Sequence, residues 1–248
     1  HGENTTLVLY EVLESEGEFT LELRPFVAGR DYHALAHANN VINRSAKFSA
    51  GVLQLAPYRD MPRILIAVPD AEFRADGMWY YNFEYSWETA RGLDAREDLF
   101  THGVLRTVMR AGSRLGVIAS TEPVRKRDAF VLYAAEKKRR EDLLSQMAVR
   151  DGFAQTLALA ADQFIVSRED GLKTIIAGYH WFADWGRDTM IALPGLCLTT
   201  GRTEDAKQIL RAFAKAVSQG MLPNRFTDDG NGAEYNSVDA SLWFFVAV

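Results

Sequence analysis

The first part of the chain, up to about residue 125, consists of short runs in which apolar and polar residues partly alternate. Turn-forming residues separate these runs, among them residues 15–18, Pro69 and Gly77. A period of two is typical of strands with one buried face, and repeated short strands joined by turns indicate an antiparallel β-sandwich. We expect the aromatic residues Trp79 and Trp87 on the faces of its sheets. The predicted strands cover residues 6–13, 19–24, 51–56, 63–68, 78–85, 103–109 and 115–120.

Near residue 135 the period of the apolar residues changes to that of helices. Asp151 precedes an apolar run and is placed to cap its helix, and Asp170 and Gly171 separate two short strands, as in a hairpin. We predict helices at residues 136–147, 152–165 and 203–217, after Asp188 and after Asn236, with hairpin strands at residues 164–167 and 174–177. The sequence therefore predicts a multidomain β + α protein. Its parts are a β-sandwich domain at residues 1–125, a helical linker at 126–150 and the incomplete start of a helical domain at 151–248.

Composition and charge exclude several classes of function. The net charge of −5, and the acidic neighbours of the basic run at residues 137–140, exclude a nucleic-acid-binding protein. The single cysteine, Cys197, cannot form an intramolecular disulfide and lies in an apolar run, where we expect a small buried side chain in a reducing, cytoplasmic location. The apolar runs are shorter than the roughly 18 residues that span a bilayer, so we expect no membrane partner. The sequence has no paired metal-ligand spacing and no phosphate or dinucleotide motif, so we expect no metal and no cofactor.

Two short stretches, residues 181–188 and 234–239, combine carboxylates with aromatic rings, and an apolar helix is predicted directly after each. A pyranose has apolar C–H faces that aromatic rings can cover and hydroxyls that Asp, Arg and Asn can bind. Cleavage of a glycosidic bond needs one carboxyl group as proton donor and a second to activate water or attack directly. The candidate sugar-binding or catalytic residues in these stretches are Trp181, Asp184, Trp185, Arg187, Asp188, Glu234, Tyr235, Asn236 and Asp239. Asn224 and Arg225 are further candidates, because they lie in the long irregular segment at residues 220–243, and connections of that length tend to be functional.

A structural interpretation stays open for several of these residues. Asp188 and Asp239 are both placed where an aspartate commonly caps a helix and needs no ligand. Residues 228–232 resemble the start of a calcium loop, but no glutamate occupies the twelfth position, so we do not expect metal binding there. The tryptophans, the arginine and the second aspartate beside Asp188 make a functional site as plausible there as a cap. For Asp239, the neighbours Tyr235, Asn236 and Trp243 favour a functional site.

The chain resembles the prokaryotic-type glycogen-debranching enzymes, the amylo-α-1,6-glucosidases, along nearly its whole length. Residues 23–33 resemble their N-terminal β domain, and residues 178–189, 222–226 and 234–244 resemble the first third of their (α/α)6 barrel. This resemblance implies inverting hydrolysis of the α-1,6-linked glucose at branch points, with glycogen or a branched α-glucan as the substrate. It also implies that Arg187 and Asp188 hold hydroxyls of the terminal glucose, that Asp239 is the general acid, and that the catalytic base lies beyond Val248. Ala233 departs from the proline expected before the Glu-Tyr-Asn run.

Two alternatives remain. One is another inverting (α/α)6 glycosidase, of the glucoamylase or trehalase kind, and the other is a fragment that binds glucan without cleaving it. The chain begins with His and stops at Val248 within an apolar helical run, so we expect it to be part of a longer protein and inactive alone. For Asp239 to donate a proton, its pKa should be raised by a partly apolar site, which Trp243 and Phe244 could supply. The sequence predicts no particular oligomeric state.

Overall fold

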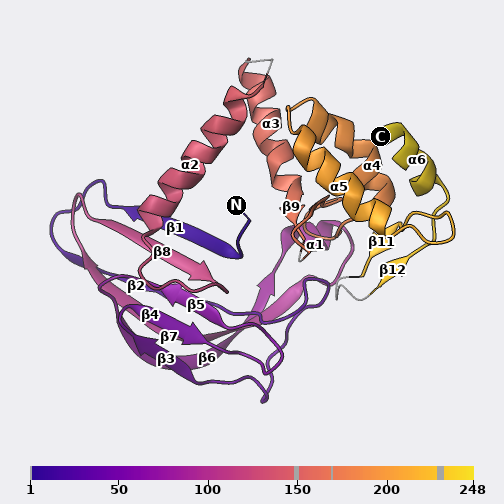
Figure 1. Ribbon diagram of the computed structural model, residues 1–248. Coiled ribbons are helices and arrows are strands. Elements are labelled where there is room, and N and C mark those ends of the chain that lie inside the picture. Colours follow the sequence, from indigo (N-terminus) through magenta and orange to yellow (C-terminus); the bar gives the residue numbers. More distant parts are fainter. Residues whose placement is uncertain (1, 148–150, 169, 228–231) are drawn as a thin grey trace. The chain divides into compact units, whose positions relative to one another are not determined.

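The computed structural model describes residues 2–147, 151–168, 170–227 and 232–248. It divides into two compact units, residues 3–136 and residues 137–248, which are described separately below (Figure 1). The first unit is built mainly from antiparallel strands, and the second mainly from helices with two short hairpins. Of the segment that resembles the start of a calcium loop, residues 228–231 lie outside the described residues.

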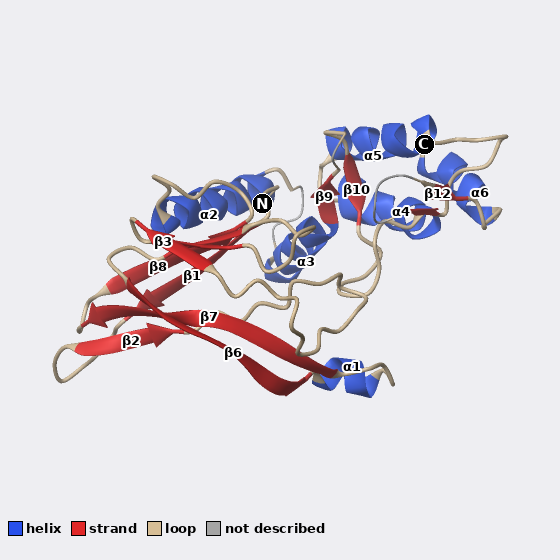
Figure 2. Cartoon of the chain, turned by 90° about the horizontal axis from the view of Figure 1, so that it is seen from below, coloured by secondary structure: helices blue, strands red, loops and turns tan. Residues whose placement is uncertain are grey.

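Two antiparallel sheets form the first unit (Figures 1 and 2). The strand order is β1-β8-β5-β4-β3 in one sheet and β2-β7-β6 in the other. The sheets share a hydrophobic core, in which Leu53 and Leu55 of β4 pack with Leu105 and Met109 of β7. The strands are β1 (Thr5–Glu11), β2 (Phe19–Leu23), β3 (Ala46–Ser49), β4 (Val52–Leu55), β5 (Ile64–Ala67), β6 (Glu72–Glu84), β7 (Arg96–Met109) and β8 (Arg114–Ser120).

Every predicted strand is confirmed in part, but three details of the prediction are wrong. The short strand β3 was not predicted. Gly77 does not end a strand, because β6 continues through a β-bulge between Ala75 and Met78. Trp87 does not lie on a sheet, because it belongs to the short helix α1 (Ser86–Ala90), where it is 75% exposed.

The long helix α2 (Ala129–Ser145) contains the boundary between the two units. Its first turn packs on the five-stranded sheet, where Ala129 and Leu132 contact the cluster around Ile118 and Val124. Gly116 of β8 makes this close approach possible, since a Cβ atom at that position would lie 2.5 Å from the Cβ of Ala129.

The second unit contains four further α-helices and one π-helix among the described residues: α3 (Gly152–Phe164), α4 (Gly186–Leu193), η1 (Pro194–Leu198), α5 (Thr203–Lys215) and α6 (Asp239–Ala247). Two hairpins connect them, formed by β9 (Ile165–Ser167) with β10 (Lys173–Ile175) and by β11 (Arg225–Phe226) with β12 (Ala233–Glu234). The predicted cap of α3 is confirmed, because Asp151 Oδ1 accepts a hydrogen bond of 2.9 Å from the Ala154 amide.

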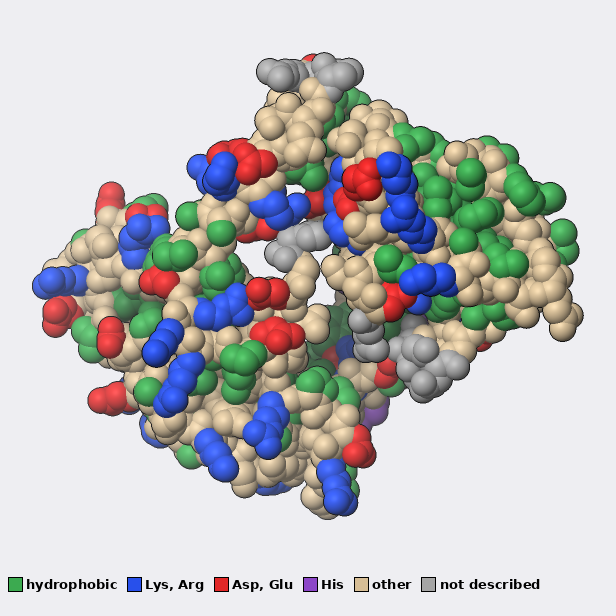
Figure 3. Space-filling model, viewed as in Figure 1, with side chains coloured by type: hydrophobic (Ala, Val, Ile, Leu, Met, Phe, Trp, Pro, Cys, Tyr) green, Lys and Arg blue, Asp and Glu red, His purple; other side chains and the backbone are tan. Residues whose placement is uncertain are grey.

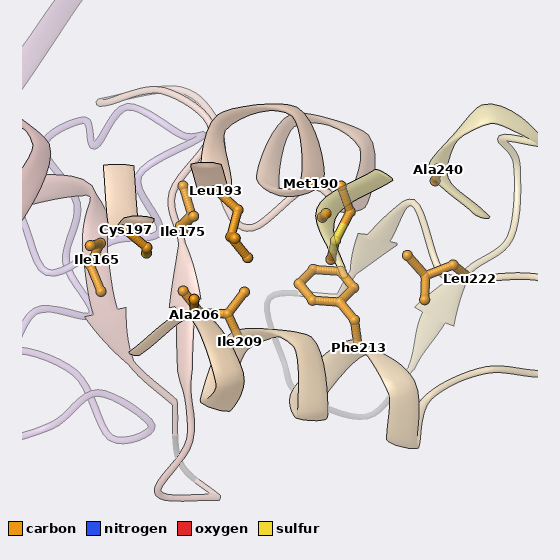
Figure 4. Close-up of a cluster of buried hydrophobic side chains, with 11 residues drawn as sticks. Ile165, Ile175, Met190, Leu193, Cys197, Ala206, Ile209, Phe213, Leu222 and Ala240 are labelled. Atoms are coloured by element: carbon orange, nitrogen blue, oxygen red, sulfur yellow. The ribbon is translucent and has the colours of Figure 1, made fainter. Parts of the chain in front are cut away.

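Apolar side chains from α4, η1, α5 and α6 meet in one core, centred on Met190, Leu193, Ile209 and Phe213 (Figure 4). Cys197 is fully buried in this core, as predicted, and burial raises the pKa of its thiol to about 11. The segment before β11 joins the same core through Leu222, whose amide donates to Ser241 Oγ of α6 at 2.8 Å.

Charged side chains also connect the helices of the second unit. Asp162 of α3 is 4% exposed and accepts hydrogen bonds from Arg139 at 2.5 and 3.1 Å and from Arg202 at 2.6 Å. Arg202 also donates to Asp205 at 2.7 Å, and Asp205 pairs with Lys173 of β10 at 2.7 Å. This network connects α2, α3, β10 and α5.

Neither a membrane span nor a metal-ligand cluster is found in the part of the chain that the structure describes. No described helix is both long and apolar enough to cross a bilayer. The described residues also contain no group of three or more His, Cys, Asp or Glu side chains arranged to hold a metal ion.

Candidate active site

The two motif stretches meet through the backbone of Asn224. The Gly186 amide, at the start of α4, donates to the Asn224 carbonyl at 2.8 Å, and the Asn224 amide donates to the Glu234 carbonyl at 2.8 Å. Gly186 is required for this approach, since a Cβ atom there would collide with the carbonyl oxygen of Pro223. The start of α4 is thereby joined to the hairpin that leads into α6, and the first turns of α4 and α6 lie side by side.

Arg187 and Asp239 form the polar contact between these two turns. Arg187 Nη1 lies 3.3 Å from Asp239 Oδ2, although the two residues are 52 positions apart. Their side chains are 48% and 45% exposed, so both can be reached by a ligand. Ser237 also donates its hydroxyl hydrogen to Asp239 Oδ1.

The electrostatic environment of Asp239 differs from the one expected for a proton donor. The hydrogen bond from Ser237 and the contact with Arg187 lower the pKa of Asp239 below its ordinary value. Trp243 is itself 38% exposed, and the Asp239 carboxylate is open to solvent, so desolvation is too weak to reverse this shift. The prediction that the pKa of Asp239 is raised is therefore wrong.

The structure does not support capping by Asp188. Helix α4 begins at Gly186 after Trp185, so Asp188 lies inside the first turn, where a negative charge is favoured by the helix dipole. Among the described residues its carboxylate has no hydrogen-bond or ion-pair partner. A half-buried carboxylate beside an exposed guanidinium is suited to accept hydroxyl groups of a ligand.

Helix α6 likewise has no side-chain cap at its N-cap residue, Val238. Asp239 is the first residue of this helix, and the Ala240 amide instead donates to Ser237 Oγ at 3.4 Å. Ser237 thus contacts both Asp239 and the start of the helix. The sequence analysis did not single out this serine, although a serine just before an apolar helical run is a recognisable N-cap signal.

Asp184 is an internal ion-pair partner. It is 9% exposed and accepts a hydrogen bond of 2.5 Å from Arg168. The guanidinium carbon of Arg168 lies 4.2 Å from the centre of the Phe226 ring, which adds a cation–π contact. Sequence analysis did not identify Arg168, because nothing in the hairpin turn that contains it indicates a partner 16 residues away.

The amide side chains of Asn224 and Asn236 bind each other. Asn224 is 6% exposed, and its Nδ2 donates to Asn236 Oδ1 at 3.0 Å. Asn224 Oδ1 is buried with no hydrogen-bond partner among the described residues. These contacts connect the segment before β11 to the segment before α6, so Asn224 serves the packing of the site as well as any ligand.

The remaining candidates border the same region. Arg225 and Glu234 are paired across the β11–β12 hairpin, with 4.0 Å between Nη1 and Oε1. The Tyr235 hydroxyl donates to the Ala216 carbonyl at 2.6 Å and fixes this hairpin to the end of α5. The rings of Trp181 and Trp185 are half-buried. The Trp181 ring lies 6.0 Å from the His180 ring, and the Trp185 ring lies 6.1 Å from the Phe182 ring, measured between centroids.

Comparison with known proteins matches both units to one kind of enzyme. Residues 1–115 match the family model described as glycogen debranching enzyme N terminal, and residues 159–248 match the model described as amylo-alpha-1,6-glucosidase. The chain belongs to the glycogen-debranching enzyme family. The second match contains Arg187, Asp188 and Asp239, and the first contains the loop between β2 and β3.

Among curated proteins, the glycogen debranching enzyme of Saccharomyces cerevisiae (strain ATCC 204508 / S288c) is 35% identical over 106 residues. The match covers 38% of this chain and 7% of the yeast protein, so the chain spans a small part of that relative's length. No solved structure matches the chain.

Proposed function

We propose that the protein hydrolyses the α-1,6-linked glucose at branch points of glycogen or a related branched α-glucan. The observation that carries this proposal is the meeting of Arg187 and Asp239 at 3.3 Å, with the carboxylate of Asp188 in the same turn as Arg187. One cation and two carboxylates at the surface of a helical unit are suited to hold sugar hydroxyls and to reach a glycosidic oxygen. Membership of the glycogen-debranching enzyme family supports this substrate class.

We further propose that the second unit is the opening part of an (α/α)6 barrel and that the first is a β-sandwich. The exposed apolar surface of α4 and α6 supports the barrel, because helices of such a barrel are covered by further helices. Hydrophobic side chains gather over α4 and α6 in Figure 3. The exposed large apolar side chains are Ile191 of α4 and Leu242, Trp243, Phe245 and Val246 of α6.

In the proposed mechanism, Arg187 and Asp188 bind hydroxyls of the terminal glucose and Asp239 protonates the leaving oxygen. Inversion would require a second carboxylate about 6.5–9.5 Å from Asp239 to activate water. When a sugar hydroxyl takes the place of Asp239 on Arg187, one cause of the lowered Asp239 pKa is removed. A sugar that covers the carboxylate also excludes water, which raises the pKa further, so substrate binding itself would prepare the acid.

The test is the substitution Asp239→Asn in the natural protein that contains this chain. We expect the rate of glucose release from an α-1,6-branched limit dextrin to fall at least 100-fold, since general acid catalysis contributes on the order of 10²–10⁴. The KM should change little, because Asn can still accept a hydrogen bond from Arg187. A turnover of the variant comparable to that of the wild type would remove Asp239 from this role. If the wild-type protein hydrolysed maltose-type substrates or trehalose faster than the limit dextrin, it would be a different glycosidase.

A second candidate function is glucan binding without catalysis by these 248 residues. The lowered pKa of Asp239 favours it, because an ionised carboxylate cannot donate a proton. We expect the 248-residue chain to bind malto-oligosaccharides and to release no glucose. Glucose release by this chain would refute that expectation.

A further inference from the structure

A buried carboxylate in the first unit holds one loop in place. The Glu97 side chain of β7 is fully buried and accepts a bidentate pair of hydrogen bonds from Arg30, at 2.6 and 3.0 Å. Tyr85 donates its hydroxyl hydrogen to Glu97 at 2.5 Å, and the Ala36 amide donates at 3.0 Å. A buried charge is costly unless it is fully paired, and here it has four donors.

The next residue of β7 holds the same loop. Asp98 accepts hydrogen bonds from the amides of Ala38 and Asn82, both at 2.9 Å. Further along, Asn39 donates to the Tyr58 hydroxyl at 2.9 Å, and the Asn39 carbonyl accepts from Trp79 Nε1 at 3.3 Å. The loop between β2 and β3 is therefore attached to the sheet at Arg30 and again from Ala36 onward.

The residues between these attachments form an exposed turn. The Asp31 carboxylate accepts a hydrogen bond from the His33 amide at 2.8 Å, and the Asp31 carbonyl accepts from the Ala34 amide at 3.1 Å. Arg30, the partner of Glu97, also donates to the Asp31 carbonyl at 3.2 Å. Residues 31–34 are all exposed although the turn is fixed at both ends.

The side chains of this turn form an aromatic surface. The rings of Tyr32 and His33 lie side by side, with centroids 4.0 Å apart and planes inclined by 36°. Tyr32 is 43% exposed. The two rings bring apolar surface together at an exposed turn, and the neighbouring Asp31 adds a carboxylate. Aromatic surface beside a hydrogen-bonding group is the combination that a pyranose needs for stacking and hydrogen bonding.

We propose that Asp31, Tyr32 and His33 form a glucan-binding turn, which contacts a glucose unit of an α-glucan chain. The inference rests on the proposed function for the class of ligand. The buried Arg30–Glu97 pair has a role in it, because a turn fixed before binding loses less conformational entropy when the sugar binds. Tyr32 and His33 contact the ligand, whereas Arg30 and Glu97 position them.

The test is an NMR titration of the 248-residue chain with maltoheptaose. The His33 imidazole resonance is assigned with His33→Gln, and the Tyr32 ring resonances with Tyr32→Phe. We expect both sets of resonances to shift with saturation, and we expect Tyr32→Ala to raise the dissociation constant read from His33 about tenfold. Tyr81→Ala is the matched control, since Tyr81 is a 63% exposed tyrosine of the same unit, outside the turn.

Two results separate this inference from the proposed function. If the indole resonances of Trp181 and Trp185 respond to maltoheptaose while His33 and Tyr32 do not, the glucan-binding turn is refuted and the proposed function stands. If none of these four residues responds, the glucan-binding turn and the second candidate function, glucan binding by the 248-residue chain, are both refuted, and the hydrolytic function is tested by Asp239→Asn alone. An equal loss of affinity in Tyr32→Ala and Tyr81→Ala would also overturn the inference, because the effect would not be specific to the turn.

Discussion

The substitution Asp162→Asn tests whether buried charge holds the second unit together. Asp162 is 4% exposed and accepts three hydrogen bonds from Arg139 and Arg202, whose side chains come from outside α3. Asparagine keeps the shape but removes the charge that both guanidinium groups pair with. Breaking a buried ion pair at one partner costs about 3–5 kcal/mol. We expect about 3 kcal/mol here, because the amide oxygen retains one acceptor.

Asp142→Asn is the matched control, since Asp142 pairs with Lys138 at 3.0 Å on the exposed surface of α2. An exposed pair one helical turn apart contributes about 0.3–0.5 kcal/mol. Amide hydrogen exchange of α3 in increasing urea measures the local free energy of unfolding without assuming that both units unfold together. Equal losses in the two variants, or a loss below about 1 kcal/mol for Asp162→Asn, would refute the role of the network.

The lowered pKa of Asp162 also predicts that the stability of α3 depends on pH. Burial alone would raise the pKa of Asp162, but hydrogen bonds and charge from Arg139 and Arg202 lower it overall. A carboxyl group with a lowered pKa in the folded state contributes its full stabilisation above the unfolded pKa of about 3.9 and loses it as the pH falls through the folded value. The wild-type chain should therefore lose stability in α3 below about pH 4, and Asp162→Asn should show a shallower decline.

Two further predictions concern the helical unit. Gly186→Ala should lower the stability of this unit by about 1–3 kcal/mol, because the added methyl group meets the Pro223 carbonyl. Gly195→Ala is the control and should leave the stability unchanged, because a Cβ atom there has no neighbouring atom within 4 Å. Thermal unfolding of the two variants measures the difference. Cys197 should resist alkylation at pH 8 in the folded chain and react in urea, because burial raises the pKa of its thiol to about 11; rapid reaction without denaturant would contradict the buried position.

The strands that the sequence predicts correctly are those in which alternation coincides with burial on one face. In β4, Leu53 and Leu55 are buried while Val52 and Gln54 are less so, and the pattern is visible without any knowledge of the partner strand. Strand β3 was missed because its four residues contain a single large apolar side chain, Phe48, and its pairing depends on β4. The residues around Gly77 are compatible both with a turn that ends a strand and with a β-bulge inside a strand, and only the pairing with β7 distinguishes the two.

The site shows a similar limit. The sequence predicts candidate sugar-binding residues from their chemical type, but it cannot separate side chains that face a ligand from side chains that are bonded inside the protein. Asp184 and Asp188 are four residues apart in one motif, yet Asp184 is paired with Arg168 while the Asp188 carboxylate has no described partner. Asn224 lies in a motif too, but it is buried and its side-chain amide donates a hydrogen bond to Asn236. These differences come from contacts between segments, which local sequence does not encode.

The contact between Arg187 and Asp239 accounts for both the recognition and the acid chemistry that we propose. Without a sugar, Arg187 stabilises the ionised form of Asp239, and the Ser237 hydroxyl has the same effect, so the carboxylate is a hydrogen-bond acceptor at neutral pH. A glucose hydroxyl that binds Arg187 competes directly with this contact. Sugar binding and protonation of Asp239 are then coupled, because each weakens the Arg187–Asp239 pair, and thermodynamic linkage requires that each favours the other. Glucan binding should therefore be accompanied by proton uptake near the pKa of Asp239.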